Sequence, residues 1–181
     1  MTPPVRPLSR WKRLAADQSG LAAVEFGLIS TFLVIGLVNG VEIARWYLQS
    51  MQVSNAVQSA TLAVWSACDV KSLPAKTKCA GLNSAIATGL ASTSLGTSVR
   101  ATDGYPKEGY FCVNGAGALQ KVANYTEAKP STCTAAGSAT TKPGDYVIVS
   151  ASYNFSPIFS GLTIGNLMPK TMSSAGSMRL Q

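Results

Sequence analysis

A single carboxylate, that of Glu25, stands in an apolar stretch where no other side chain can ionise. The stretch covers residues 21–41, and none of residues 26–41 carries an ionisable group. A charged side chain at the centre of a bilayer costs roughly 2.5 to 3.5 kcal/mol, and less near the bilayer edge. We therefore interpret Glu25 as a functional carboxylate whose chemistry is ion pairing. The alternative is a carboxylate that only lies at the headgroup level of a signal anchor.

Cysteines form the second group of reactive side chains: Cys68, Cys79, Cys112 and Cys133. An even number of cysteines in a segment expected to be exported favours two disulfides. Of the three pairings, the most local one joins Cys68 to Cys79 and Cys112 to Cys133. The competing hypothesis is a zinc site made of all four thiolates, but the chain has no histidine and no C-x-x-C pair. We expect disulfides and no metal or other cofactor.

Acid–base or nucleophilic catalysis has little support in the sequence. Histidine is absent, and no serine stands in a nucleophile-elbow pattern. The exported acidic residues lie in expected turns or beside basic residues, without a recognisable pairing for acid–base work. These residues are Asp69, Asp103, Glu108, Glu127 and Asp145. We therefore expect no catalytic residue and no enzymatic activity.

A short basic leader precedes the apolar stretch. The charged side chains of residues 1–20 are Arg6, Arg10, Lys12, Arg13 and Asp17. An excess of lysine and arginine beside a first apolar segment keeps that side of the segment in the cytoplasm. We expect a cytoplasmic N-terminus and export of the chain that follows.

The apolar stretch has the length of a membrane span and continues as an amphipathic helix. Its length matches the roughly 20 residues that cross a bilayer as a helix. The run passes into residues 41–48 without the small-residue cleavage site of a signal peptide, so we expect it to be retained. Beyond Ile43, apolar residues recur mostly every three or four positions: Trp46, Met51, Val53, Val57, Ala60 and Val64. We predict one helix over residues 21–67.

Residues 68–181 are predicted to form one small exported domain, so that the chain belongs to the α+β class. Periodicity and turn residues predict a helix at residues 79–91 and antiparallel strands at residues 98–101, 110–113 and 146–155. An Asp-Gly turn separates the first two strands. These 114 residues are enough for one core, but a marginal one, so the disulfides would help to stabilise it. The apolar segment 156–170 is expected to pack against the core, with contact to a neighbouring subunit as the alternative.

Glycine precedes the apolar run and glutamate follows five residues later in Gly20-Leu21-Ala22-Ala23-Val24-Glu25-Phe26. This spacing resembles the processing signature of type IV prepilin-like proteins. Together with residues 42–47, it resembles the TadE-like family of minor pilins and pseudopilins from tight-adherence (Tad, Flp-type type IVc) pilus systems. Residues 145–157 and 171–175, separated by a Gly/Pro-rich loop, are similar to the strand, loop and strand that close such chains. Phe26 departs from the family's frequent tyrosine, although both are aromatic.

The resemblance implies cleavage by a prepilin peptidase on the cytoplasmic side. Gly20 would precede the cut, Leu21 would become the N-terminus, and Glu25 and Phe26 would serve assembly. Cleavage would create a free amine on Leu21, one helical turn from Glu25. Opposite charges attract more strongly in a low-dielectric setting than in water. The amine that pairs with the carboxylate could belong to the same subunit or to a neighbour.

The resemblance also implies a structural component needed for pilus biogenesis and surface adherence. The expected partners are the prepilin peptidase, the major and other minor pilins, and the assembly platform in the inner membrane. The expected location is the bacterial inner membrane, crossed once, with the C-terminal domain in the periplasm or incorporated into a surface pilus. The alternative hypothesis is an uncleaved single-pass anchor with an extracytoplasmic binding or adhesive domain.

The net charge does not indicate a nucleic-acid partner. The formal charge is +7, and residues 1–20, with four basic side chains against one acidic side chain, contribute +3 of it. The basic residues of the exported part are scattered between Lys71 and Arg179. They form no basic run and no interleaving with aromatic residues, which are typical of nucleic-acid binding. We therefore expect no nucleic-acid partner.

Overall fold

The helix α2 (Ser19–Ala67) begins the part of the chain that the computed structural model describes, which comprises residues 19–159, 161 and 163–180. Nearly all of the predicted leader, residues 1–18, lies outside the described residues. α2 is continuous over 49 residues, which confirms the single helix predicted for residues 21–67. Its sequence contains no proline, the residue that most strongly breaks a helix.

The described chain forms two compact units, and each is considered on its own. The helix–loop unit contains α2 up to residue 43 together with the loop segment 157–167. The sheet unit contains residues 44–156 and the chain from residue 168 onward. The boundary between the two units falls between residues 43 and 44, within α2, so each unit contains part of this helix.

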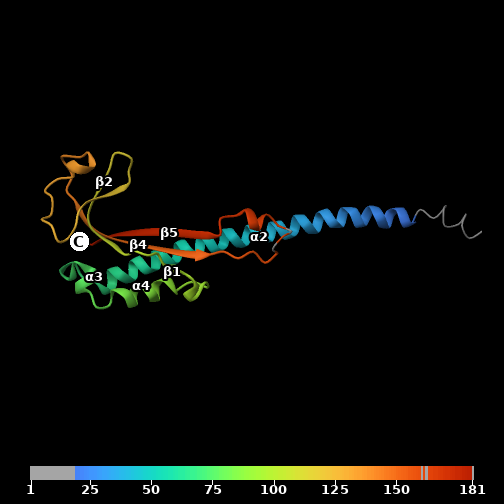
Figure 1. The fold of residues 1–181 in the computed structure, drawn as a ribbon, viewed down its shortest axis with the longest axis horizontal. Coiled ribbons are helices and arrows are strands. Elements are labelled where there is room, and N and C mark those ends of the chain that lie inside the picture. The colour runs from blue at the N-terminus through green and yellow to red at the C-terminus, as the bar shows by residue number, and fades with distance from the viewer. Residues whose placement is uncertain (1–18, 160, 162, 181) are drawn as a thin grey trace, which may run out of the picture. The chain divides into compact units, whose positions relative to one another are not determined.

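An antiparallel five-stranded sheet and several short helices follow α2 in the chain (Figure 1). The short helical elements are η1 (Val70–Ser72), α3 (Ala75–Lys78), α4 (Leu82–Leu90), η2 (Gly96–Ser98), η3 (Thr134–Ala136) and η4 (Ile164–Leu167). The strands are β1 (Arg100–Ala101), β2 (Lys107–Val113), β3 (Leu119–Ala123), β4 (Gly144–Asn154) and β5 (Thr171–Leu180). This architecture confirms the predicted α+β class with a long N-terminal helix.

Strand β4 is the centre of the sheet. β5 pairs antiparallel with β4 over all of its residues, while β1 and β2 pair with the other edge of β4. Alternate side chains of residues 147–155 enter the core, as the period-two sequence predicts: Val147, Val149, Ala151 and Phe155 are buried, and Tyr153 packs against them. The strongest predicted strand is therefore the one on which the sheet is built.

β1 and β2 lie end to end along one edge of β4. Ala101 at the end of β1 pairs with Ala151, and Lys107 at the start of β2 pairs with Ile148. The predicted turn between two strands is confirmed, but these strands pair with β4 rather than with each other. Gly104 has a positive φ of 81°, a left-handed conformation that glycine adopts without steric cost. This turn lets the chain leave the sheet edge and return to it.

The sequence did not predict β3, which pairs antiparallel with β2. A tight turn joins the two strands, and the side chain of Asn114 organises it. Asn114 Oδ1 accepts hydrogen bonds of 3.0 Å from the backbone N–H groups of Ala116 and Ala118. A side chain that binds its own backbone in this way stabilises a turn locally.

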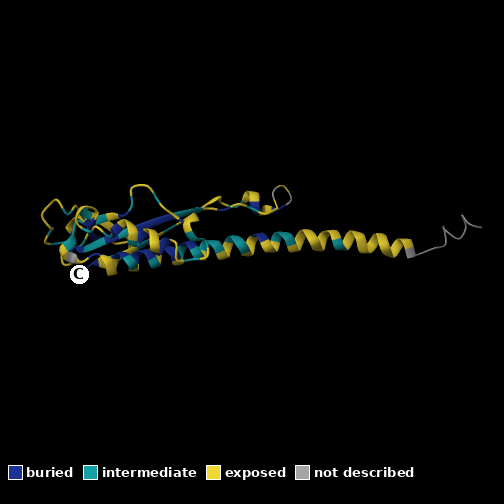
Figure 2. Cartoon of the chain, turned by 90° about the horizontal axis from the view of Figure 1, so that it is seen from below, coloured by how far each residue is buried: buried dark blue, intermediate teal, exposed yellow. Residues whose placement is uncertain are grey.

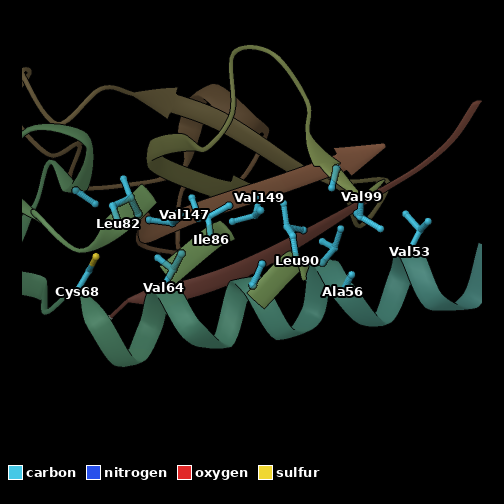
Figure 3. Close-up of a cluster of buried hydrophobic side chains, with 14 of the residues drawn as sticks. Val53, Ala56, Val64, Cys68, Leu82, Ile86, Leu90, Val99, Val147 and Val149 are labelled. Atoms are coloured by element: carbon cyan, nitrogen blue, oxygen red, sulfur yellow. The ribbon is translucent and has the colours of Figure 1, made fainter. Parts of the chain in front are cut away.

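The core of the sheet unit lies between α2, α4 and one face of β4 (Figure 3). The helices contribute Val53, Ala56, Val57, Ala60 and Val64 from α2 and Leu82, Ile86 and Leu90 from α4. Met51 was predicted on the same stripe of α2, but it is 48% exposed. Two positions along a helix correspond to about 200° of rotation. Met51 therefore points away from the side that Val53 presents to the core.

Two disulfides fasten the sheet unit. Cys68, after the end of α2, is bonded to Cys79, which precedes α4. Cys112 of β2 is bonded to Cys133. The most local of the three pairings is thus confirmed. No cysteine remains free, so the competing zinc hypothesis has no thiolate left to use.

Gly89 allows α4 to pack closely on α2. A Cβ atom at residue 89 would lie 2.6 Å from the backbone nitrogen of Ala60 and 3.0 Å from its Cβ. Atoms attached to a helical backbone cannot rotate away from such an overlap. Any larger residue at this position must push the two helices apart.

We predict that Gly89→Ala lowers the free energy of unfolding by about 1 to 3 kcal/mol, the usual cost of overpacking a core. Helix propensity alone would change stability in the other direction, since alanine is favoured over glycine in a helix interior by about 1 kcal/mol. Chemical denaturation of the full chain in detergent measures the change. Gly115→Ala is the control, because a Cβ at residue 115 would have nothing within 4 Å. Equal stabilities of the two variants would contradict the packing argument.

Candidate functional site

The first half of α2 is almost entirely exposed (Figure 2), and most of its exposed side chains are large and apolar. Residues 20–37 are exposed except for Ser30, which is partly buried. Among the described residues, one helix is long and apolar enough to cross a membrane, and it is α2. Such a surface needs an apolar environment to cover it. The chain is therefore consistent with a single-pass membrane protein.

The uncharged polar side chains in this segment are satisfied by the helix itself. The hydroxyls of Ser30 and Thr31 donate to the carbonyl of Gly27, at 3.0 and 2.8 Å. The amide of Asn39 donates to the carbonyl of Ile35 at 2.8 Å. Placing a polar group in an apolar environment costs much free energy when the group has no hydrogen-bond partner. The cost is small when the group binds a carbonyl one turn back in its own helix. Glu25 thus stands apart as the charged side chain of the segment.

The four residues predicted to serve processing and assembly lie in the exposed start of α2. Gly20, Leu21, Glu25 and Phe26 are all exposed. Leu21 and Glu25 are four positions apart, so they lie on the same face of the helix. Phe26 points to a different side, one residue further on. The geometry brings the predicted new N-terminus and the carboxylate together, and the cleavage itself stays a prediction.

Glu42 is a site residue that was not predicted from the sequence. It belongs to residues 42–47, which were compared with the TadE-like family, but no role was predicted for its side chain. Its side chain is fully buried, with 0% exposure. Oε1 accepts hydrogen bonds from the backbone N–H groups of Ile158 at 2.6 Å and Phe159 at 3.0 Å. Hydrogen bonds to an ionised carboxylate are among the strong ones in proteins. Glu42 therefore fixes the loop segment 157–167 to the helix.

Asn39 makes a second attachment one turn before Glu42. Its Oδ1 accepts a hydrogen bond of 2.9 Å from the backbone N–H of Ile164, at the start of η4. Inside the loop, the hydroxyl of Thr163 donates to the carbonyl of Phe159 at 2.9 Å. The loop segment is thus held at two points by polar side chains of α2 and closed by a hydrogen bond of its own.

The described large apolar side chains of this loop do not enter the core, contrary to the favoured prediction for the segment; Leu162, which belongs to the same prediction, lies outside the described residues. Ile158, Phe159, Ile164 and Leu167 are 57%, 40%, 41% and 85% exposed. The physical reason is that backbone hydrogen bonds to Glu42 and Asn39 position the loop, rather than burial of its side chains. The loop leaves an apolar surface of its own in the helix–loop unit.

A separate cleft of about 780 Å³ lies in the sheet unit beside the β2–β3 hairpin. Its charged and aromatic lining residues are Lys76, Lys107, Lys121, Glu108, Tyr105, Phe111 and Tyr125. The Glu108 carboxylate accepts a hydrogen bond of 2.7 Å from the backbone N–H of Ala75. Among the described residues, none of these three lysines forms a salt bridge with a carboxylate. The cleft therefore carries an excess of positive charge.

The backbone of β2 shapes one wall of the cleft. Gly109 has a φ of 147°, and a Cβ there would lie 2.7 Å from Cε of Lys121. The absence of a side chain lets Lys121 lie across the strand toward the cleft. The ammonium group of Lys107 lies 4.8 Å from the ring centre of Tyr105, within the range of a cation–π interaction.

Two titrating groups near the cleft have displaced pKa values. Burial raises the pKa of Tyr125 well above its ordinary value, and the negative charges of Asp145 and Glu108 raise it further. Tyr125 therefore keeps its proton and donates a hydrogen bond to the carbonyl of Tyr146 at 3.4 Å. The backbone N–H of Asn124 lowers the pKa of Glu127 by donating to its carboxylate at 3.1 Å.

No protein-family model, curated protein or solved structure matches this chain. Within the described residues, no group of three or more carboxylate, imidazole or thiol side chains is placed to hold a metal ion. Function is therefore inferred from the residues and contacts given above. The apolar half of α2, with Glu25 and the loop bound at Asn39 and Glu42, is the candidate functional site.

We predict that Glu42→Ala releases the loop from α2. Hydrogen bonds to charged groups contribute about 1.5 to 3 kcal/mol each, so amide exchange of Ile158 and Phe159 should accelerate by at least about tenfold. Hydrogen–deuterium exchange with mass spectrometry on the full chain in detergent measures this. Glu127→Ala, which removes an exposed carboxylate in the sheet unit, is the control. Unchanged exchange in Glu42→Ala would contradict the attachment.

Proposed function

We propose that this protein is a TadE-like minor pilin or pseudopilin of a Tad-type pilus, cut after Gly20 and held in the bacterial inner membrane before assembly. The observation that carries the proposal is the position of Glu25. It is the charged residue of an exposed apolar helix segment, and it lies one turn after Leu21. The helix leads without interruption into a disulfide-bonded domain.

Cleavage after Gly20 gives the Glu25 carboxylate a partner. The cut converts the amide nitrogen of Leu21 into a charged amine at the start of the helix. Residues four apart on a helix have Cβ atoms about 5 to 6 Å apart, so the amine and the carboxylate can approach. A neighbouring subunit's amine satisfies the same carboxylate when helices pack side by side. An ion pair in an apolar setting would select the processed chain for assembly.

The surface of α2 also offers a place where a neighbouring helix can pack. A shallow hollow lies over Gly36, bordered by Phe32 and Leu37. A Cβ at Gly36 or Gly40 would meet nothing within 4 Å. Small residues four positions apart let helix backbones approach closely in membranes. This feature supports packing by the major and other minor pilins without identifying them.

Processing is tested by the intact mass of the protein with and without a co-expressed prepilin peptidase. We predict a peptidase-dependent start at Leu21 for the unchanged chain, and a start at Met1 for Gly20→Val, whose larger residue blocks the cut.

Glu25→Ala should be processed but recovered in sheared pili at about one tenth or less of the normal amount, because a charged hydrogen bond contributes about 1.5 to 3 kcal/mol.

Glu127→Ala is the matched control for Glu25→Ala, since it removes an exposed carboxylate far along the sequence. It should be processed and incorporated normally. A chain that begins at Met1 in the presence of the peptidase would reject the pilin proposal. Normal pilus incorporation of Glu25→Ala would reject the assembly role of Glu25 while leaving processing intact.

The second candidate function is that of an uncleaved membrane anchor with an extracytoplasmic binding domain. The observation that favours it is the cleft lined by Lys76, Lys107 and Lys121. The three ammonium groups outnumber the one lining carboxylate, that of Glu108, and an excess of positive charge attracts anions. The nearby tyrosine rings offer flat apolar surfaces. An acidic carbohydrate is the ligand class that such a cleft fits.

We predict that the full chain in detergent binds polygalacturonate. Lys107→Ala with Lys121→Ala should weaken this binding roughly two- to thirtyfold, since exposed ion pairs contribute about 0.2 to 1 kcal/mol each. Isothermal titration calorimetry at two salt concentrations measures the change. The control combines Lys71→Ala with Lys142→Ala, which removes the same charge away from the cleft. Equal weakening in both variants would show that net charge, rather than the cleft, attracts the polymer.

A further inference from the structure

We propose that the loop segment 157–167 is a second membrane contact, which rests in the lipid interface beside α2. The partner is a lipid surface, contacted by the exposed side chains of Ile158, Phe159, Ile164 and Leu167. This inference rests on the proposed insertion of α2 into a membrane. It adds a membrane contact that comes from the C-terminal part of the chain.

The attachment points of the loop coincide with the far edge of a membrane span. Asn39 and Glu42 follow Leu21 by about 27 and 32 Å along the helix, at 1.5 Å per residue. The hydrocarbon core of a bilayer is about 30 Å thick. When Leu21 lies at one edge of the hydrocarbon, both attachments lie at the other edge. The loop is thereby held at the depth where apolar side chains meet lipid headgroups.

The composition of the loop suits that depth. None of residues 157–167 has an ionisable side chain. Leu167 is 85% exposed and Ile158 is 57% exposed, so their apolar surface is available to lipid. The same unit contains the exposed apolar half of α2. The two apolar surfaces therefore belong to one body, which a bilayer can cover together.

The hydrogen bonds of the loop explain how irregular backbone is tolerated there. Non-helical backbone near the hydrocarbon requires a partner for each polar group. Glu42 provides it for the N–H groups of Ile158 and Phe159, and Asn39 provides it for that of Ile164. Gly165 permits the tight closure, since a Cβ there would lie 3.1 Å from Pro157. The polar contacts are made with the helix, whereas Ile158, Phe159, Ile164 and Leu167 are exposed.

The competing partner for this surface is a second copy of the chain. Lipid is favoured because the attachments lie at the depth of a bilayer edge and because the loop's surface is entirely free of charges that would specify a protein partner. A test must therefore distinguish labelling by lipid from contact between copies. It must also report separately on the insertion of α2.

The experiment reconstitutes the full chain into phosphatidylcholine vesicles that contain a diazirine-bearing phosphatidylcholine. Irradiation attaches the probe to residues in contact with lipid, and mass spectrometry of peptides locates it. We expect labelling of the α2 peptide around Phe32 and of the peptide carrying residues 157–167. The peptide carrying Val113, which is 54% exposed in the sheet unit, should remain unlabelled and serves as the control.

Two variants connect the labelling to the attachment. Glu42→Ala should reduce loop labelling by about tenfold, in line with the loss of hydrogen bonds to a charged group, and leave α2 labelling unchanged. Glu42→Gln keeps an oxygen acceptor in the same position and should restore loop labelling toward normal. Equal loop labelling in all three chains would overturn the role of Glu42 in holding the loop in the interface.

The remaining outcomes separate this inference from the proposed function. Labelled α2 with an unlabelled loop would overturn the inference and leave membrane insertion standing. Unlabelled α2 would reject the membrane anchor itself. A separate reaction of the same vesicles with a bifunctional protein cross-linker tests contact between copies. Cross-links from the loop to a second chain, with no lipid adducts on the loop, would overturn the inference in favour of contact between copies.

Discussion

One helix in this protein has to suit two environments, and the rest of the structure depends on that constraint. The first half of α2 is apolar all round, whereas its second half buries one stripe and exposes the others. The sheet cannot cover its inner face alone, because β4 directs Val147, Val149 and Ala151 toward α2 and α4. A sheet with one apolar face needs another element to bury it. α2 is therefore both the apolar segment and the floor of the sheet unit's core.

Long periodic elements could be predicted from the sequence, and elements fixed by distant contacts could not. The apolar stripe of α2 and the apolar–polar alternation of β4 repeat over many residues, so both periods can be recognised in the sequence. β3 is short, none of its residues is fully buried, and it contains the polar Gln120 and Lys121. No period in the sequence identifies it. The end-to-end arrangement of β1 and β2 depends on their register with β4, which local sequence does not encode. Met51 was wrongly predicted to lie on the buried stripe of α2. It is two residues before Val53, and this separation puts the two side chains on different sides of the helix.

The same distinction applies to the candidate site. Glu25 could be found because it interrupts an apolar run in which every other side chain is uncharged. Glu42 lies close to Arg45 in a stretch where charge is unremarkable, so no local pattern singles it out. Its hydrogen-bond donors are backbone groups 116 and 117 positions away, and any residue except proline supplies such a group. Sequence alone carries no signal for a contact of that kind.

The two carboxylates of α2 face opposite physical situations, and this difference supports their separate assignments. Glu42 is enclosed, and its Oε1 accepts hydrogen bonds from backbone N–H groups of its own chain, so its carboxylate contributes to the structure of the helix–loop unit. Glu25 is exposed, and no described residue of its own chain donates a hydrogen bond to it or pairs with it. An ionised carboxylate on an apolar helix is strongly disfavoured without a partner in a low-dielectric environment. Outside the described residues, a partner can come from water, a lipid headgroup, a newly formed amine or another subunit. Of these, only the last two would make its charge serve assembly, because only they depend on processing or on a neighbouring chain.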